Sequence, residues 1–76
     1  MQKWEYAFVT CEYHNNGWRP QYVNCQEIRD WKRGPDISDF SNQLGADGWE
    51  LVNLMTGHNE FGNTSAYRLV FKRSKP

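Results

Sequence analysis

The sequence has few of the features that identify an enzyme, a membrane protein or a secreted protein. Its 76 residues include only two cysteines and three prolines, and no apolar run approaches the roughly 18 residues that span a bilayer. The first residues, MQKWEYAFV, lack the basic segment and apolar core of a secretory signal. We therefore expect a cytoplasmic protein that does not bind a membrane, in which Cys11 and Cys25 are reduced thiols.

Neither sign of charge is in excess, since nine basic residues balance nine acidic ones. Domains dedicated to nucleic acids are usually basic, so the balance argues against such a partner. The chain is instead rich in aromatic residues, which make up 16% of it. Each buried aromatic side chain removes about 150–250 Å² from water. One small core does not easily hide that much surface, so part of it is expected to meet a partner.

Residues 3–13, KWEYAFVTCEY, have the period-two alternation and the aromatic and β-branched content of a strand. One predicted face carries Trp4, Tyr6 and Phe8, and the other carries Ala7, Val9, Cys11 and Tyr13. Both faces of this strand are apolar, so we expect both to be covered.

A tight turn is predicted after this strand. Asn16-Gly17 is the dipeptide that a two-residue type I′ turn prefers, because both of its central residues need positive φ. Residues 19–28 then return as a second strand. Pro20 near the start of that strand indicates an edge position, since proline has no N–H to donate to a neighbouring strand.

A short helix is predicted next. Asp36 is a good N-cap residue, and Asp39 three residues later weakly resembles the second half of a capping box. Ile37, Phe40 and Leu44 recur as one apolar stripe. A helix this short is unstable alone in water, so we expect it to lie on the sheet.

Two interpretations compete for the glycines of LGADGWELV, residues 44–52. If Gly48 is the left-handed residue that ends the helix, a Schellman ending brings Leu44 and Trp49 together. Gly45 then lies inside the helix, where we expect it to permit close approach to the sheet or to an indole ring. The alternative is a phosphate-binding loop, but such glycines normally follow a strand and open a helix, whereas these close one.

Two more strands are predicted at 49–56 and 66–73, separated by a turn region at 57–65. Alternation in the first groups Leu51 with Met55, and Val52 with Leu54. In the second, Tyr67, Leu69 and Phe71 share one face, and Ala66, Arg68, Val70 and Lys72 share the other.

Residues 1–76 thus form a single α+β domain: a four-stranded antiparallel sheet with one helix packed on one face, in the order β-β-α-β-β. The uncovered face predicts a homo-oligomer.

Three segments, KWEY at 3–6, LGADGWELV at 44–52 and VFKR at 70–73, resemble a family of short bacterial and phage proteins. It is catalogued as domain of unknown function 4177. Asp47 stands where that family usually has glutamate, and the stretch between first strand and helix is longer here. The resemblance implies a small α+β domain without an established activity, and it supplies no catalytic residues.

Four residues are of types that bind zinc: Cys11, His14, Cys25 and His58. Their spacing is poor for a metal site. The predicted turn places Cys11 opposite Tyr22 and Cys25 opposite Phe8, so the two sulfur atoms point to opposite faces. Nothing places either thiol beside a histidine base, as nucleophilic catalysis requires. We therefore expect free thiols, no metal, no cofactor and no catalytic residues.

Residues 29–35, RDWKRGP, are the segment where a functional interpretation competes best with a structural one. They surround an indole with cations on a predicted loop. The candidate ligand or interface residues are Trp31, Arg33, Lys32, Arg29, Arg19 and Trp18. An exposed indole beside guanidinium groups can stack on a base and contact a phosphate, or anchor a protein interface. It can equally fold back over the helix and leave the cations in solvent.

The sequence therefore predicts a small non-catalytic binding or interaction module that self-associates through the open sheet face and the 29–35 loop. The alternative is a protein that binds or sequesters a small nucleotide-like anion in a site between subunits, lined by Trp31, Arg33 and Arg19, with Trp18 as a further candidate.

Overall fold

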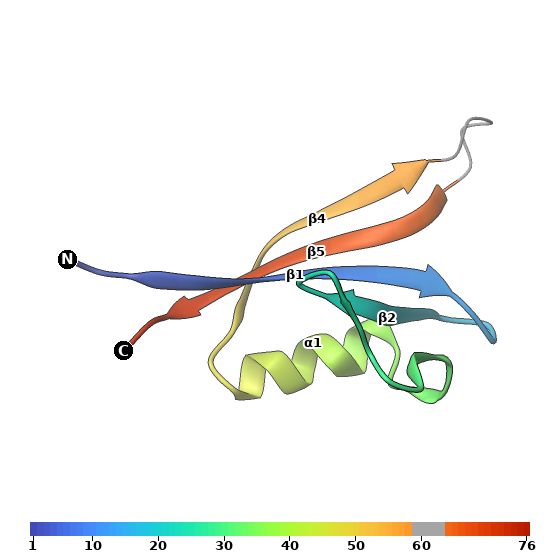
Figure 1. Cartoon of the computed structure of the whole chain (residues 1–76), viewed down its shortest axis with the longest axis horizontal. Helices are drawn as coiled ribbons and strands as arrows, with labels where there is room; N and C mark the ends of the chain where they lie inside the picture. The colour runs from blue at the N-terminus through green and yellow to red at the C-terminus, as the bar shows by residue number, and fades with distance from the viewer. Residues whose placement is uncertain (59–63) are drawn as a thin grey trace.

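The structure is a computed structural model of the whole chain, and it describes residues 1–58 and 64–76. An α-helix packs on one face of a five-stranded antiparallel sheet (Figure 1). The strands are β1 (Trp4–Tyr13), β2 (Trp18–Val23), β3 (Gln26–Glu27), β4 (Glu50–His58) and β5 (Thr64–Ser74), and the helices are α1 (Ile37–Ala46) and a short 3₁₀ helix, η1 (Trp31–Arg33). The sheet order is β3-β2-β1-β5-β4. The α+β class is confirmed, but the predicted number of strands is wrong.

The fifth strand exists because residues 19–28 do not form one continuous strand. Asn24 and Cys25 both have positive φ, 50° and 68°, so the chain reverses there and β3 pairs with the last two residues of β2. Asn24 fixes this turn against β1, since its N–H donates to the Phe8 carbonyl (2.8 Å) and its side chain accepts from the Phe8 N–H (2.9 Å). Pro20 lies on the part of β2 that does not pair with β3, although β3 and not β2 is the outermost strand of the sheet.

The β1–β2 turn is centred one residue earlier than predicted. Asn15 and Asn16, rather than Asn16 and Gly17, have positive φ, 55° and 63°. The His14 N–H donates to the Gly17 carbonyl (2.8 Å) across them. Asparagine tolerates the left-handed region well enough to occupy both central positions of a type I′ turn.

The earlier turn changes the strand register. Tyr13 lies opposite Trp18, and their rings meet edge to face with centroids 5.4 Å apart. Cys11 lies opposite Pro20, so the predicted pairing of Cys11 with Tyr22 is wrong. An aromatic contact of this kind contributes about 0.5–1.5 kcal/mol beyond area burial, enough to offset the preference of one turn dipeptide over another.

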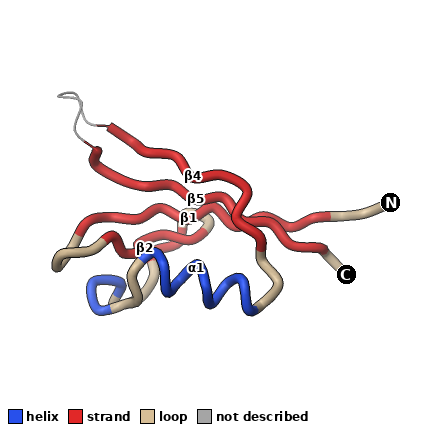
Figure 2. Tube along the Cα trace, turned by 180° about the vertical axis from the view of Figure 1, so that it is seen from behind, coloured by secondary structure: helices blue, strands red, loops and turns tan. Residues whose placement is uncertain are grey.

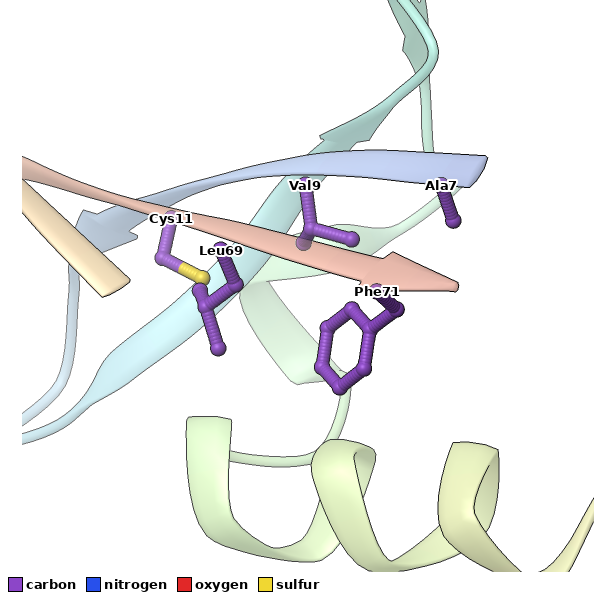
Figure 3. Packing of buried hydrophobic residues seen from close by; sticks show 5 residues of the cluster. All are labelled: Ala7, Val9, Cys11, Leu69 and Phe71. Atoms are coloured by element: carbon purple, nitrogen blue, oxygen red, sulfur yellow. The ribbon is translucent and has the colours of Figure 1, made fainter. Parts of the chain in front are cut away.

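The core lies between α1 and the central pair of strands, β1 and β5 (Figure 3). Its buried side chains are Ala7, Val9, Cys11, Leu69 and Phe71. Val9 lies opposite Leu69 and Ala7 opposite Phe71, and directly opposed residues of an antiparallel pair point to the same face. The predicted alternation of both strands is therefore confirmed.

The helix begins and packs as its sequence predicts. The Asp36 side chain accepts a hydrogen bond from the Asp39 N–H (2.9 Å), which caps the first turn. Ile37, Phe40 and Leu44 are half-buried and pack against the core.

The helix ends in the predicted Schellman motif. Gly48 has a φ of 91°, the Trp49 N–H donates to the Leu44 carbonyl (3.0 Å), and the Gly48 N–H donates to the Gly45 carbonyl (3.0 Å). The role predicted for Gly45 is wrong, however. A Cβ atom added there would meet nothing within 4 Å, because this side of α1 faces solvent.

A register shift just after Leu51 changes the faces of β4. Leu51 lies opposite Phe71 and Leu54 opposite Leu69, so both point toward the side of α1. The predicted grouping of Leu51 with Met55 is wrong, because the extra residue of a bulge reverses the alternation that follows it. Of the predicted turn region 57–65, residues 59–63 lie outside the described residues.

The helix covers only part of its face of the sheet. Figures 1 and 2 show α1 beneath β1 and β2, while the β4–β5 hairpin extends away from it. The two termini lie near each other at the opposite end of the molecule. Among the described residues, neither helix is long and apolar enough to cross a bilayer.

Candidate functional site

The sheet face opposite α1 carries a row of exposed aromatic side chains. Trp4, Tyr6 and Phe8 are 42%, 49% and 57% exposed. They alternate along β1 with the buried residues of the core, so backbone geometry directs all three away from the helix. We call this surface the open face and define it by residues that the strand register places together: Trp4, Tyr6, Phe8, Thr10, Tyr22, Glu50, Asn53, Met55, Arg68, Val70 and Lys72.

Contacts between side chains support the aromatic row. The Tyr6 and Phe8 rings are stacked at 27°, with centroids 6.4 Å apart. The Lys72 ammonium lies 4.4 Å from the centroid of the Trp4 ring, a cation–π contact. Lys72 also lies opposite Glu50, so charges of both signs border the aromatic residues. The exposed rings are therefore held in place by contacts with neighbouring side chains.

The apolar surface extends across β5 to β4. Phe8 lies opposite Val70, and Thr10 lies opposite Arg68. Arg68 in turn lies opposite Met55, which is 44% exposed. Sequence alternation alone assigned Met55 to the face of Leu51, and only the strand pairing reveals that it belongs to the open face.

The loop of residues 29–35, which we call the Trp31 loop, is partly structural. Trp31 begins η1 and is half-buried, with its ring edge to face against His14 at 5.8 Å. Arg29, Lys32 and Arg33 are exposed. The indole is therefore held against His14, and the three cations beside it are exposed.

Arg19 joins the Trp31 loop to the hairpin turn. Its Nη1 donates to the Gly34 carbonyl (2.7 Å), and its Nε donates to the His14 carbonyl (3.1 Å). The structure therefore brings this predicted candidate to the loop, but it directs the guanidinium at three backbone carbonyls of the protein, the third being that of Asn15 (3.5 Å). This arrangement favours a structural role for Arg19.

An open hollow of about 490 Å³ lies beside the Trp31 loop. Its lining residues are Gln21, Glu27, Asp30, Trp31 and Lys32. The two carboxylates outnumber the single ammonium group, a balance that does not favour an anion.

Trp18 is not part of the hollow's lining. It lies between Tyr13 and Tyr67, with ring centroids 5.4 Å and 4.4 Å away. The structure therefore brings together only some of the candidates predicted from the sequence.

The two cysteines are free and differ in environment. Cys11 is fully buried in the core, and burial raises the pKa of its thiol from 9.0 to about 12. It is therefore neutral near pH 7, and a neutral thiol is a poor nucleophile. Cys25 is exposed in the β2–β3 turn, so its predicted pairing opposite Phe8 is wrong.

Residues suited to hold a metal ion do not cluster in the part of the chain that the structure describes, which contains no group of three or more His, Cys, Asp or Glu side chains with that geometry. The side chain of His58, one of the four candidates, lies outside that part.

Comparison with known proteins gives one family match. The sequence model of the family described as domain of unknown function (DUF4177) matches residues 4–74, nearly the whole chain. A search of curated proteins and a search of solved structures each gave no match.

Proposed function

Because this chain belongs to the DUF4177 family, whose description assigns no activity, we propose a function from the surface of the molecule itself. The protein is a small, non-catalytic interaction module whose copies associate through the open face. The observation that carries this proposal is the row of Trp4, Tyr6 and Phe8, each about half exposed on a central strand. Exposed apolar patches of this kind are typical of protein interaction sites.

The area of the row is compatible with a dimer. Each half-exposed aromatic side chain offers roughly 75–125 Å², so the three offer roughly 225–375 Å² per copy. Two copies then bury about 450–750 Å² through these rings alone, where a stable interface buries about 1,200–2,000 Å² in total. Tyr22, Val70 and Met55 on the same face extend the surface toward that size.

The charges around the row favour a second copy as the occupant. A two-fold symmetric interface places the same patch against itself, so a patch of one sign would repel its copy. The open face instead carries charges of both signs: Lys72 and Arg68 are cations, and Glu50 lies directly opposite Lys72 and so points to the same face. Two such faces pack as a sandwich of sheets about 10 Å apart.

The cysteines support two further parts of the proposal. Cys11 is buried and holds its proton, which suits a packing role better than nucleophilic catalysis. Both cysteines are free, the state that the reducing cytoplasm maintains. We therefore infer a cytoplasmic, non-catalytic protein.

The Trp31 loop is the proposed second contact. Its exposed Lys32 and Arg33 suit the polar rim of an interface, and the half-buried Trp31 suits an anchor. Binding of a nucleotide-like anion at this loop stays a prediction, which the geometry of Arg19 and of the neighbouring carboxylates does not favour.

Native mass spectrometry of gently purified protein tests this proposal. We expect the wild type to be a dimer or a larger even-numbered oligomer, and Phe8→Asp to be a monomer because it places a carboxylate in the centre of the interface. Tyr13→Asp is a matched control: Tyr13 is 58% exposed on the same strand, but it points to the opposite face. It should keep the oligomer.

Two results would contradict the proposal: a monomeric wild type, or a Phe8→Asp protein with the wild-type mass. Additional mass that is lost on denaturation would instead identify a bound small ligand and favour the alternative.

A further inference from the structure

A second apolar surface lies on the helix side of the sheet. Leu51 and Leu54 point to the same side as the core, yet they are 45% and 47% exposed. The buried residues of the hydrophobic core cluster come from β1 and β5. The helix thus leaves β4 uncovered on the side where its leucines point.

These leucines form one wall of an open trough of about 460 Å³ beside α1, a volume within the usual range of ligand sites. Leu69 contributes to the lining from β5. The other wall consists of α1 residues Ile37, Ser38, Ser41 and Asn42. The trough therefore combines apolar residues with small polar residues on the neighbouring helix.

We propose that this trough binds an amphipathic helix of a partner protein, packed beside α1 on β4 and β5. A segment lying on a sheet face makes no backbone hydrogen bonds to that sheet, so it must satisfy its own N–H and C=O groups. A helix does this and a single extended strand does not. Because α1 already stands on the same face (Figure 2), a helix packed beside it continues the same layer.

The lining indicates the chemistry of the helix. None of the described residues that line the trough is charged, so the inserted stripe of the partner is apolar. Ser38 and Ser41 are small enough to allow the close approach of two helices, about 8–10 Å between axes. Asp36 and Asp39 do not line the trough, but they are the acidic residues next in sequence to Ile37 and Ser38, which line it at the start of α1. A partner helix with basic residues flanking its apolar stripe complements them.

A second copy of this chain does not supply such a helix. In the part of the chain that the structure describes, α1 is the only α-helix, and its stripe of Ile37, Phe40 and Leu44 already packs against the core. The occupant is therefore another protein. The inference is independent of the open face, since the two surfaces lie on opposite sides of the sheet. A dimer joined through its open faces would present two troughs outward.

The test uses a fluorescein-labelled peptide of about 14 residues, long enough to form a helix. It contains leucine and lysine, with leucine at the i, i+3, i+4 and i+7 spacing of one helical stripe. A second peptide of the same composition alternates leucine and lysine with period two and favours a strand. We expect fluorescence anisotropy to show saturable binding of the helical peptide and much weaker binding of the alternating one.

Neighbouring residues of β4 provide matched variants. Leu54→Lys places an ammonium group in the trough and should weaken binding at least about tenfold, as loss of a central interface residue does. Met55→Lys adds the same charge one residue away on the opposite face, at similar exposure, and should leave peptide binding unchanged. Ser41→Lys from the α1 wall should repeat the effect of Leu54→Lys.

Three results would overturn the inference: no binding of the helical peptide, preferential binding of the alternating peptide, or equal binding by Leu54→Lys and the wild type. The native mass of each variant separates this inference from the proposed function. Leu54→Lys should lose the peptide and keep the oligomer, whereas Met55→Lys should keep the peptide whatever its effect on the oligomer.

Discussion

At the scale of single residues, burial and hydrogen bonding decide what the candidate functional groups do. Cys11 has the chemistry of a nucleophile, but it is fully buried in an apolar core. Arg19 has the chemistry of an anion ligand, but its guanidinium donates to the carbonyls of Gly34 and His14. The types of these two residues therefore suggested functional sites, but their surroundings in the folded protein favour structural roles.

The raised pKa of Cys11 predicts a specific pH dependence of stability. The thiol ionises near 9.0 in the unfolded chain and near 12 in the folded protein. Unfolding between these values releases a proton, so the free energy of unfolding falls as pH rises, by up to about 1.4 kcal/mol per pH unit. Below pH 9 the buried, protonated thiol contributes its full amount to the free energy of unfolding.

Urea unfolding between pH 8 and about 11 measures this slope. Cys11→Ala should be less stable at pH 8 but should lack this part of the slope, whereas Cys25→Ala should keep it. If Cys11→Ala lost stability with pH as steeply as the wild type, other groups would be the cause.

Arg19 should matter for stability even without a ligand. Arg19→Met keeps much of the side-chain length but removes the donor to the carbonyls of Gly34, His14 and Asn15, at an expected cost of about 1–3 kcal/mol. Arg33→Met, which removes an exposed cation from the same loop, should change stability by less than about 0.5 kcal/mol. Urea denaturation of both variants measures the difference. Equal stability of Arg19→Met and the wild type would return Arg19 to the list of ligand candidates.

At the scale of elements, the ends of α1 follow local sequence closely. The Asp36 cap and the Gly48 ending satisfy backbone groups within a few residues, so neighbours along the chain are enough to specify them. The strands behave differently, because their register depends on partners far along the chain. The Asn15-Asn16 turn and the shift after Leu51 show that tertiary packing overrides local preference there.

The two glycines of the helix end should respond oppositely to substitution. Gly45→Ala should stabilise the protein by about 1 kcal/mol, because alanine favours the helix and its Cβ meets nothing within 4 Å. Gly48→Ala should destabilise it by about 1–2 kcal/mol, because φ there is 91°. Thermal or urea unfolding of the pair compares them directly. Stabilisation by both substitutions would mean that Gly48 does not end the helix as described.

At the scale of the whole molecule, one helix is too little cover for a five-stranded sheet. The open face exposes Trp4, Tyr6 and Phe8, and the helix side exposes Leu51 and Leu54. A small domain buries a smaller fraction of its surface on folding than a large domain does, so association is a physical route to covering what remains. Together, the two proposals describe an adaptor that joins its own copy on one side of the sheet and a partner helix on the other.

The sequence by itself determined the α+β class, the two ends of the helix and the faces of β1 and β5. Alternation in Trp4–Tyr13 and the stripe of α1 are visible in neighbouring residues, and capping is completed within one turn. These features are local, so they need no knowledge of the rest of the chain.

Only the tertiary structure decided the strand register, the fifth strand and the composition of the two surfaces. Asn15 with Asn16 and Asn16 with Gly17 differ little as turn centres, and the contact of Tyr13 with Trp18 accompanies the turn that forms. A single extra residue after Leu51 then moved Met55 to the open face and Leu54 to the trough. Local preferences of about 1 kcal/mol are comparable to single long-range contacts, so packing across the sheet selects between alternatives that the chain alone leaves nearly equal.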